Sequence, residues 1–177
     1  MENKKKKKIP MERQGLFFHA SAVNINGRAV LFFGQSGSGK TTISKLLSEK
    51  YPIIADDKAW ISKNRFGEWC VCGGFIDINF SKVVFDSIKK KEKYPIHSLV
   101  SIHKADSFNI EKMDAIDVCY KLVSSVFEIY IQQAMKDLAI RKRWFSDCSA
   151  ISKKYQGWRL NFKKNSFIMD YIQKILE

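Results

Sequence analysis

The sequence predicts an α/β fold in which a mixed β-sheet is flanked by helices, and three observations lead to this prediction. Residues 29–33 form a continuous apolar run, as expected for a strand buried on both faces. The glycine-rich residues 34–42 follow at once, and the apolar positions after them recur at helical spacing. A second short apolar run, residues 53–55, ends in two adjacent carboxylates. At 177 residues the chain is long enough for one α/β domain with a substantial core.

The first residues are strongly basic, whereas the rest of the chain has the composition of a globular domain. Residues 1–10 hold five lysines and one glutamate, so they supply +4 of the net charge of +13 and the remainder supplies +9. A run of like charges is usually solvated. We therefore expect a disordered basic arm at residues 1–12 and a single domain at residues 13–177.

The strand at residues 29–33 is expected to pair with the segment that precedes it. Residues 15–23 are predicted to form a strand, and residues 24–27 contain the hairpin dipeptide Asn-Gly. The hairpin makes the two strands antiparallel neighbours. It places His19 near the end of the sheet where the glycine-rich loop begins.

The later elements follow from apolar spacing and turn residues. Two runs rich in β-formers, residues 60–62 and 69–72, flank a turn at residues 64–67 and predict a second hairpin. Asp114 is a candidate helix cap. The remaining expected strands are residues 99–102 and 158–162, and the remaining expected helices are residues 80–91, 114–122, 126–140 and 166–175. The stretch at residues 126–140 could continue the helix at residues 114–122.

The glycine-rich loop fits the phosphate-binding pattern G-x-x-x-x-G-K-[ST], with Gly34, Gly39, Lys40 and Thr41 at the fixed positions. Glycines allow backbone angles that turn several N–H groups toward a phosphate at the positive end of the following helix. Lys40 would reach the β- and γ-phosphates, and the Thr41 hydroxyl would ligate Mg²⁺. The predicted nucleotide contacts are Gly34, Gln35, Ser36, Gly37, Ser38, Gly39, Lys40, Thr41 and Thr42.

The adjacent acids Asp56 and Asp57 are the second chemical signal. In P-loop folds a strand beside the loop commonly ends in an acid that supports Mg²⁺. Two neighbouring carboxylates repel each other, and a nearby dication makes the pair sustainable. The acid that is not needed by the metal could accept a proton from an attacking hydroxyl. The residues alone leave open which acid has which role.

These segments resemble the core of the HPr kinase/phosphorylase family, which is related to the phosphoenolpyruvate carboxykinase fold. The resemblance lies in His19-Ala-Ser-Ala-Val, Val30-Leu-Phe-Phe-Gly-Gln-Ser-Gly-Ser-Gly-Lys-Thr and Ile54-Ala-Asp-Asp. It implies a P-loop nucleotide-binding domain that holds ATP through Lys40 and the loop. It further implies that Asp56 is the general base toward a serine hydroxyl, that Asp57 is a metal ligand, and that His19 is a partner of the Asp56 carboxylate.

Other motifs of that family do not occur here. The acidic residue that follows the family's P-loop serine is Thr42 in this chain, and the Leu-Glu-x-Arg-Gly-Leu-Gly and Pro-Gly-Arg-Asn segments are missing. The resemblance therefore implies neither HPr as the substrate nor the reverse, phosphorylase reaction. Similar stand-alone kinases occur in peptide-modification pathways, which makes a peptide serine a suitable acceptor.

The composition bears on the cellular location of the protein and on the kinds of partner that it could bind. No apolar run approaches the roughly 20 residues of a membrane span, and four scattered cysteines are typical of reduced thiols in a cytoplasmic protein. The basic clusters, notably Arg141 and Arg143 beside Trp144, either serve solubility alone or contact an acidic protein or peptide substrate. Nucleic acid is an alternative partner without a supporting motif, and assembly into a homo-oligomer is a further expectation.

The sequence therefore favours an ATP- and Mg²⁺-dependent kinase that acts on a hydroxyl, with a serine of a protein or peptide as the first candidate. Two alternatives stay open. One is a nucleotide-binding sensor or regulatory module that transfers no phosphate, and the other is a kinase for a hydroxyl of a nucleic acid or small molecule.

Overall fold

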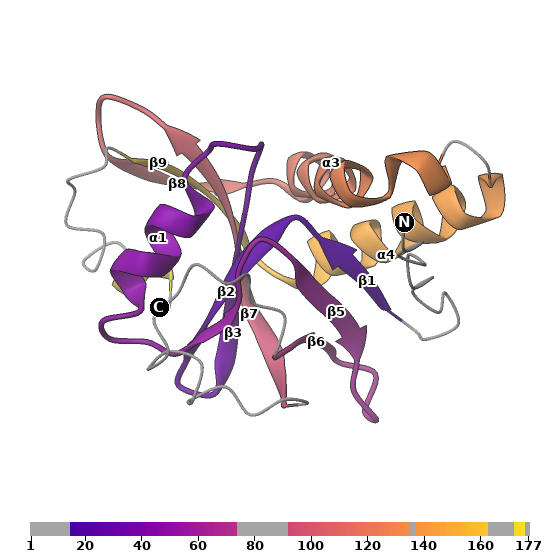
Figure 1. The fold of residues 1–177 in the computed structure, drawn as a ribbon, viewed down its shortest axis with the longest axis horizontal. Helices are drawn as coiled ribbons and strands as arrows, with labels where there is room; N and C mark the ends of the chain where they lie inside the picture. The colour runs from indigo at the N-terminus through magenta and orange to yellow at the C-terminus, as the bar shows by residue number, and fades with distance from the viewer. Residues whose placement is uncertain (1–14, 74–91, 135–136, 163–171, 176–177) are drawn as a thin grey trace, which may run out of the picture.

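The computed structural model describes residues 15–73, 92–134, 137–162 and 172–175. Within them nine strands form one sheet, and the helices α1, α3 and α4 pack around it (Figure 1). The strands are β1 (Gly15–Phe18), β2 (Ala20–Ile25), β3 (Arg28–Phe33), β4 (Ile53–Ala55), β5 (Ala59–Lys63), β6 (Trp69–Cys72), β7 (Lys93–Lys104), β8 (Asn109–Met113) and β9 (Gly157–Phe162). The helices are α1 (Lys40–Leu47), α3 (Ala115–Ala134) and α4 (Leu138–Lys154).

The sheet is mixed, as the sequence predicts, and the long strand β7 joins its parts. The strand order is β1-β5-β6-β7-β3-β2-β4, and β9 pairs with both β7 and β8. β7 runs parallel to β3 and β9, whereas β2 is antiparallel to β3. The ends of β3, β7 and β9 that lead into their following loops therefore lie at one edge of the sheet. The loop after β3 emerges at this edge.

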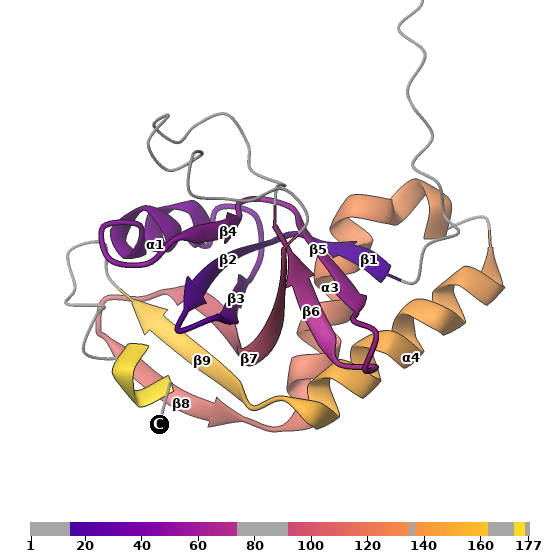
Figure 2. The ribbon, with the colours of Figure 1, turned by 90° about the horizontal axis from the view of Figure 1, so that it is seen from below.

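Helices cover both faces of the sheet, and each face has its own core. Figures 1 and 2 show α1 on one side of the molecule and the pair formed by α3 and α4 on the other. The core beneath α1 includes the buried side chains of Val30, Phe32, Ile43, Leu47 and Val100. The core beneath α3 and α4 includes those of Leu31, Phe33, Leu99, Leu122 and Ile151. The alternation along β3 and β7 explains this division, because successive strand residues point to opposite faces.

The main departures from the predicted elements occur where one segment serves two partners. Residues 15–23 form two strands, because the chain breaks at His19: β1 pairs with β5, and β2 pairs with β3. β7 is longer than the predicted residues 99–102, since its first residues pair with β6 and its later ones with β3 and β9. Residues 126–134 continue the helix of residues 115–122 as α3, which confirms the expected continuation. The expected extension of this stretch to residue 140 was wrong, because residues 138–140 belong to α4.

Several predictions concern residues outside the described part of the chain. These are the basic arm, the helix at residues 80–91 and most of the helix at residues 166–175, of which residues 172–175 are described and helical. β8 and most of α4 had no counterpart among the predicted elements. None of the described helices combines the length and apolar character that a membrane crossing requires.

Candidate functional site

The loop at residues 34–42 consists of the connection from β3 to α1 and the first three residues of α1, and it has the conformation of a phosphate cradle. Gly37 and Gly39 have φ values of 77° and 105°, in the left-handed region that favours glycine. A Cβ atom on Gly39 would also lie 2.5 Å from the ring of Phe162. α1 starts directly after Gly39, so the free N–H groups of its first turn face the loop. Ser38 Oγ is buried without a hydrogen-bond partner in the described residues, so this hydroxyl is available to a phosphate oxygen.

Lys40 is the first residue of α1, and its almost fully buried side chain reaches back to the start of the loop. Its Nζ donates hydrogen bonds to the carbonyl oxygens of Gly34 at 2.8 Å and Gln35 at 3.1 Å. Burial lowers the pKa of Lys40, and the nearby carboxylates oppose this shift. The lysine charge therefore lies in a poorly solvated place, where its attraction to an anionic phosphate is strengthened.

Asp56 faces the start of α1. It is only 3% exposed, and its Oδ1 accepts hydrogen bonds from Ser21 Oγ at 2.7 Å and Thr41 Oγ1 at 3.4 Å. Burial is the main cause that raises the pKa of Asp56, the charge of Asp57 acts in the same direction, and the bond from Ser21 opposes both. The structure thus joins two residues predicted from separate motifs, Thr41 and Asp56, through one carboxylate oxygen.

Asp57 points to a different partner because the chain turns at this residue. Its φ of 64° is left-handed, which interrupts the alternation that would send adjacent side chains to opposite faces. Its side chain is 43% exposed, and its Oδ1 lies 2.9 Å from His19 Nε2. Asp56 and Asp57 therefore reach the same region, one beside Thr41 and the other beside His19.

His19 occupies the break between β1 and β2, at the sheet edge where the hairpin argument placed it. The predicted partner was wrong, because His19 contacts Asp57 rather than Asp56. The left-handed turn at Asp57 swings that carboxylate toward the histidine, while Ser21 and Thr41 bind Asp56. The imidazole Nδ1 contacts a third carboxylate, Glu128 Oε2 of α3.

Three residues of the site were not predicted: Ser21, Ser125 and Glu128. Ser21 could have been predicted from the sequence, because residues 19 and 21 of an extended segment point to the same side. Ser125 and Glu128 lie one turn apart on α3, and they contact His19 across 106 and 109 residues of sequence. No local spacing connects them to the loop or to the two aspartates.

A Mg²⁺ ion fits the loop only with help from phosphate oxygens. In the described residues no group of three or more His, Cys, Asp and Glu side chains could hold a metal ion by itself. The hydroxyl of Thr41 and the carboxylate of Asp56 provide oxygen ligands of the type that Mg²⁺ prefers, and this ion usually takes further ligands from phosphates and water.

The predicted substrate residues lie on α4. Arg141 and Arg143 are exposed in its first turns, and Trp144 between α3 and α4 is buried. Burial raises the pKa of Tyr130, and the charge of Arg143 opposes this shift. The Tyr130 hydroxyl accepts a hydrogen bond from the backbone N–H of Phe17. The structure therefore places Arg143 near the part of α3 that borders β1, and it gives neither arginine a contact with the loop.

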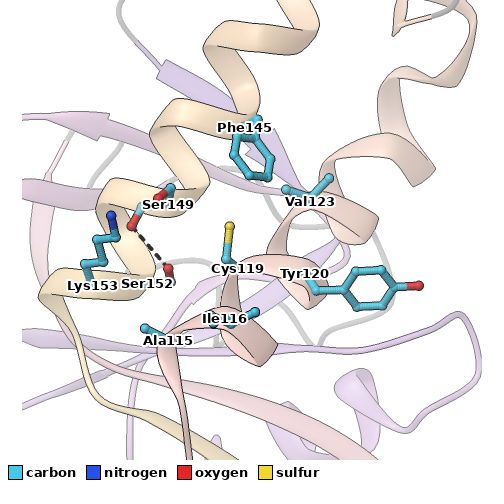
Figure 3. Close-up of a pocket in the computed structure, with 9 residues that line it drawn as sticks. All are labelled: Ala115, Ile116, Cys119, Tyr120, Val123, Phe145, Ser149, Ser152 and Lys153. Atoms are coloured by element: carbon cyan, nitrogen blue, oxygen red, sulfur yellow. Dashed lines mark hydrogen bonds between the residues drawn. The ribbon is translucent and has the colours of Figure 1, made fainter.

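An apolar pocket of about 310 Å³ lies between α3 and α4, apart from the loop and the aspartates (Figure 3). Its lining residues are Ala115, Ile116, Cys119, Tyr120, Val123, Phe145, Ser149, Ser152 and Lys153. Ile116, Tyr120 and Phe145 are exposed there. The catalytic candidates lie elsewhere, since none of Lys40, Asp56, Asp57 and His19 lines this pocket.

The arrangement of these elements is that of a known kinase fold. The structure resembles that of the HPr(Ser) kinase/phosphatase from Coxiella burnetii with a TM-score of 0.50 and 10% sequence identity, over 90% of this chain and 87% of that one. At this identity the likeness concerns the fold, which is therefore the P-loop domain of the HPr kinase type. The predicted resemblance and fold class are confirmed.

Sequence comparison then assigns the chain to a family. The profile of the family described as SynChlorMet cassette protein ScmC matches residues 7–177, and the chain belongs to this family. It is also 38% identical over 87 residues to a phosphoenolpyruvate carboxykinase (ATP) from Amoebophilus asiaticus (strain 5a2). That match spans 46% of this chain and only 16% of the carboxykinase, so it relates one segment of a much longer enzyme to this chain.

Proposed function

We propose that the chain is an ATP- and Mg²⁺-dependent kinase that transfers the γ-phosphoryl group to a serine hydroxyl of a protein or peptide. One observation carries the proposal: a phosphate-binding loop with its lysine lies beside a half-exposed carboxylate that is held by a histidine. The loop is residues 34–42, the lysine is Lys40, and the pair is Asp57 and His19. A loop that only binds nucleotide has no need for such a pair next to its lysine.

The loop provides binding and charge stabilisation. Its N–H groups and the start of α1 would hold the β- and γ-phosphates, and Lys40 Nζ would exchange a backbone carbonyl for a phosphate oxygen. Thr41 and Asp56 would hold Mg²⁺, which when bound supplies positive charge to the phosphates. This role for Asp56 differs from the role implied by the resemblance, and its contact with Thr41 supports it.

Asp57 is then the general base. Its half-exposed carboxylate can accept the proton of the acceptor hydroxyl as the new bond forms between the hydroxyl oxygen of the acceptor and the γ-phosphorus. The bond from the γ-phosphorus to the bridging oxygen breaks in the same displacement, and ADP leaves with that oxygen and its electron pair. Asp56 is less suited to this task because it is buried and already accepts two hydrogen bonds.

The choice of a serine in an acidic protein or peptide rests on the fold that this chain shares with a serine kinase and on its own positive charge. The structure that shares the fold is described as an HPr(Ser) kinase/phosphatase, which acts on serine according to its name. The formal net charge of +13 and the exposed Arg141 and Arg143 suit an acidic protein or peptide as the acceptor. Self-assembly and a cytoplasmic location remain parts of the proposal.

The test measures ADP formation from Mg·ATP with and without acceptors. The acceptors are a panel of serine peptides of varied charge, the same peptides with alanine for serine, and small alcohols. We expect ADP formation to rise with at least one serine peptide and to stay at the basal level with its alanine counterpart. Tight Mg·ATP binding without transfer to any acceptor would favour a nucleotide sensor, and transfer to an alcohol alone would replace the peptide acceptor.

A further inference from the structure

The imidazole of His19 lies between two carboxylates, one on each ring nitrogen. Nε2 lies 2.9 Å from Asp57 Oδ1, and Nδ1 contacts Glu128 Oε2 of α3. We propose that Glu128 is a positioning residue of the phosphotransfer site, which fixes the ring of His19 so that Nε2 faces Asp57. The inference rests on the proposed function for its kinetic consequence, whereas its structural content does not.

Both contacts of the ring favour the same orientation. Rotating an imidazole by half a turn would replace both nitrogens by carbons at the two carboxylates, so the paired acceptors select a single ring flip. The side chain of His19 is only 16% exposed, and that of Glu128 is 33% exposed. Without Glu128, the orientation of the ring would rest on Asp57 alone, which is the residue whose position the ring is needed to hold.

The backbone around His19 fixes the distance between this ring and α3. His19 N–H donates to the carbonyl oxygen of Ser125 at 3.2 Å, and Ser125 Oγ donates to the carbonyl oxygen of His19 at 3.1 Å. Ser125 and Glu128 are three residues apart and therefore share a helix face. Ser125 of α3 thus binds the main chain at the break between β1 and β2, and Glu128 of α3 contacts the histidine ring.

Glu128 also lies close to the lysine of the phosphate-binding loop. Among the charges that raise the pKa of Lys40 against the effect of burial, that of Glu128 is the largest, followed by those of Asp57 and Asp56. The titratable groups that face one another here come from four places in the fold: Lys40 from α1, His19 between β1 and β2, the two aspartates after β4, and Glu128 from α3. Glu128 belongs to this cluster.

The kinetic test compares Glu128→Ala with Glu128→Gln, using Mg·ATP and an acidic serine peptide. The amide oxygen of glutamine can accept the same Nδ1–H bond, whereas alanine cannot. We expect Glu128→Ala to lower kcat roughly tenfold, the scale seen when the orienting partner of a functional histidine is removed. The KM for ATP should change little, and Glu128→Gln should restore most of kcat.

Two comparisons separate positioning from other roles. Asp117→Ala removes another exposed carboxylate from α3, one that lies 3.7 Å from Arg159, and should leave kcat unchanged. In a His19→Ala background, Glu128→Ala should cause no further loss, because the two residues act as a unit. A full additional loss there, or a glutamine variant as impaired as the alanine variant, would overturn the proposal in favour of a direct charge effect of Glu128.

A readout independent of catalysis comes from the histidine ring itself. The chain has three histidines, so ¹⁵N-histidine labelling gives three ring systems, and His19→Gln identifies the signals of His19. Glu128→Ala should shift both ring nitrogens of His19, and Asp117→Ala should shift neither. Unchanged His19 signals in Glu128→Ala would refute the positioning role. If the wild-type protein forms no ADP while these shifts occur, the kinase proposal fails and the contact stands.

Discussion

Exchanging each of the two adjacent aspartates for asparagine should produce two different defects. Asp57→Asn keeps the size of the side chain and removes the basic oxygen, so phosphoryl transfer should fall by roughly 10²-fold or more, the usual scale for a positioned base. Mg·ATP should still bind, because Asp57 accepts no hydrogen bond from Thr41, whereas Asp56 does. The expected result is thus a loss of turnover at nearly unchanged nucleotide affinity.

Asp56→Asn should instead raise the Mg²⁺ concentration needed for half-maximal activity, by roughly 10- to 100-fold, with turnover partly recovered at high Mg²⁺. Asparagine can still accept the hydrogen bond from Ser21, so the fold should persist. Burial raises the pKa of Asp56, so in the metal-free protein the charged carboxylate opposes folding as the pH rises through that raised pKa. In EDTA, Asp56→Asn should therefore unfold at a higher temperature than the wild type near neutral pH, and this advantage should disappear in acid.

The assay for this pair is a matrix of ADP formation against Mg²⁺ and ATP concentrations, together with calorimetric Mg·ATP binding. A single pattern shared by both variants would contradict the division of roles. The reverse pattern, with the metal defect in Asp57→Asn and the turnover defect in Asp56→Asn, would restore the assignment implied by the family resemblance. The two patterns can be told apart because Thr41 contacts Asp56, whereas His19 contacts Asp57.

Three further predictions follow from the loop, the basic helix and the histidines. Lys40→Ala should weaken Mg·ATP binding measured by calorimetry, whereas Thr41→Ala should chiefly raise the Mg²⁺ requirement; unchanged binding and turnover in both would contradict the phosphate role. Reversing the charges of residues 141–143 should raise the KM of an acidic peptide and flatten its salt dependence, and an equal loss of ATP affinity would count against an acceptor role. Burial and nearby cations lower the pKa of His97 and His103 below 6.5, so the unfolding free energy should fall as the pH drops below 6.5; urea titrations should show a flatter pH dependence when both are glutamine.

The parts of the site that are close in sequence could be predicted from spacing alone. The loop at residues 34–42 is flanked by a strand and a helix, and the structure shows both. The hairpin through residues 24–27 correctly brought His19 to the same sheet edge. The side to which each aspartate points could not be predicted, because it depends on the left-handed φ of Asp57, a conformation that is uncommon outside glycine.

The missed elements and contacts have non-local causes. α4 begins after Asp137, whose side chain accepts hydrogen bonds from the N–H groups of Ala139 and Ile140. Aspartate is a preferred cap, so this signal was available, but the apolar residues on either side read as one continuous helix. The contact between His19 and Glu128 had no such signal, because it depends on how α3 packs against β1.

The most direct test of the central claim follows the label of radioactive ATP. The wild-type protein and Lys40→Ala are incubated with Mg²⁺, a serine peptide that stimulates ADP formation, and ATP labelled at either the γ- or the α-phosphate. The account predicts that γ-label appears on the peptide serine, that α-label does not, and that Lys40→Ala transfers far less. Transfer of α-label, or γ-label transfer that is equal in Lys40→Ala, would contradict a γ-phosphoryl transfer site built on the loop at residues 34–42.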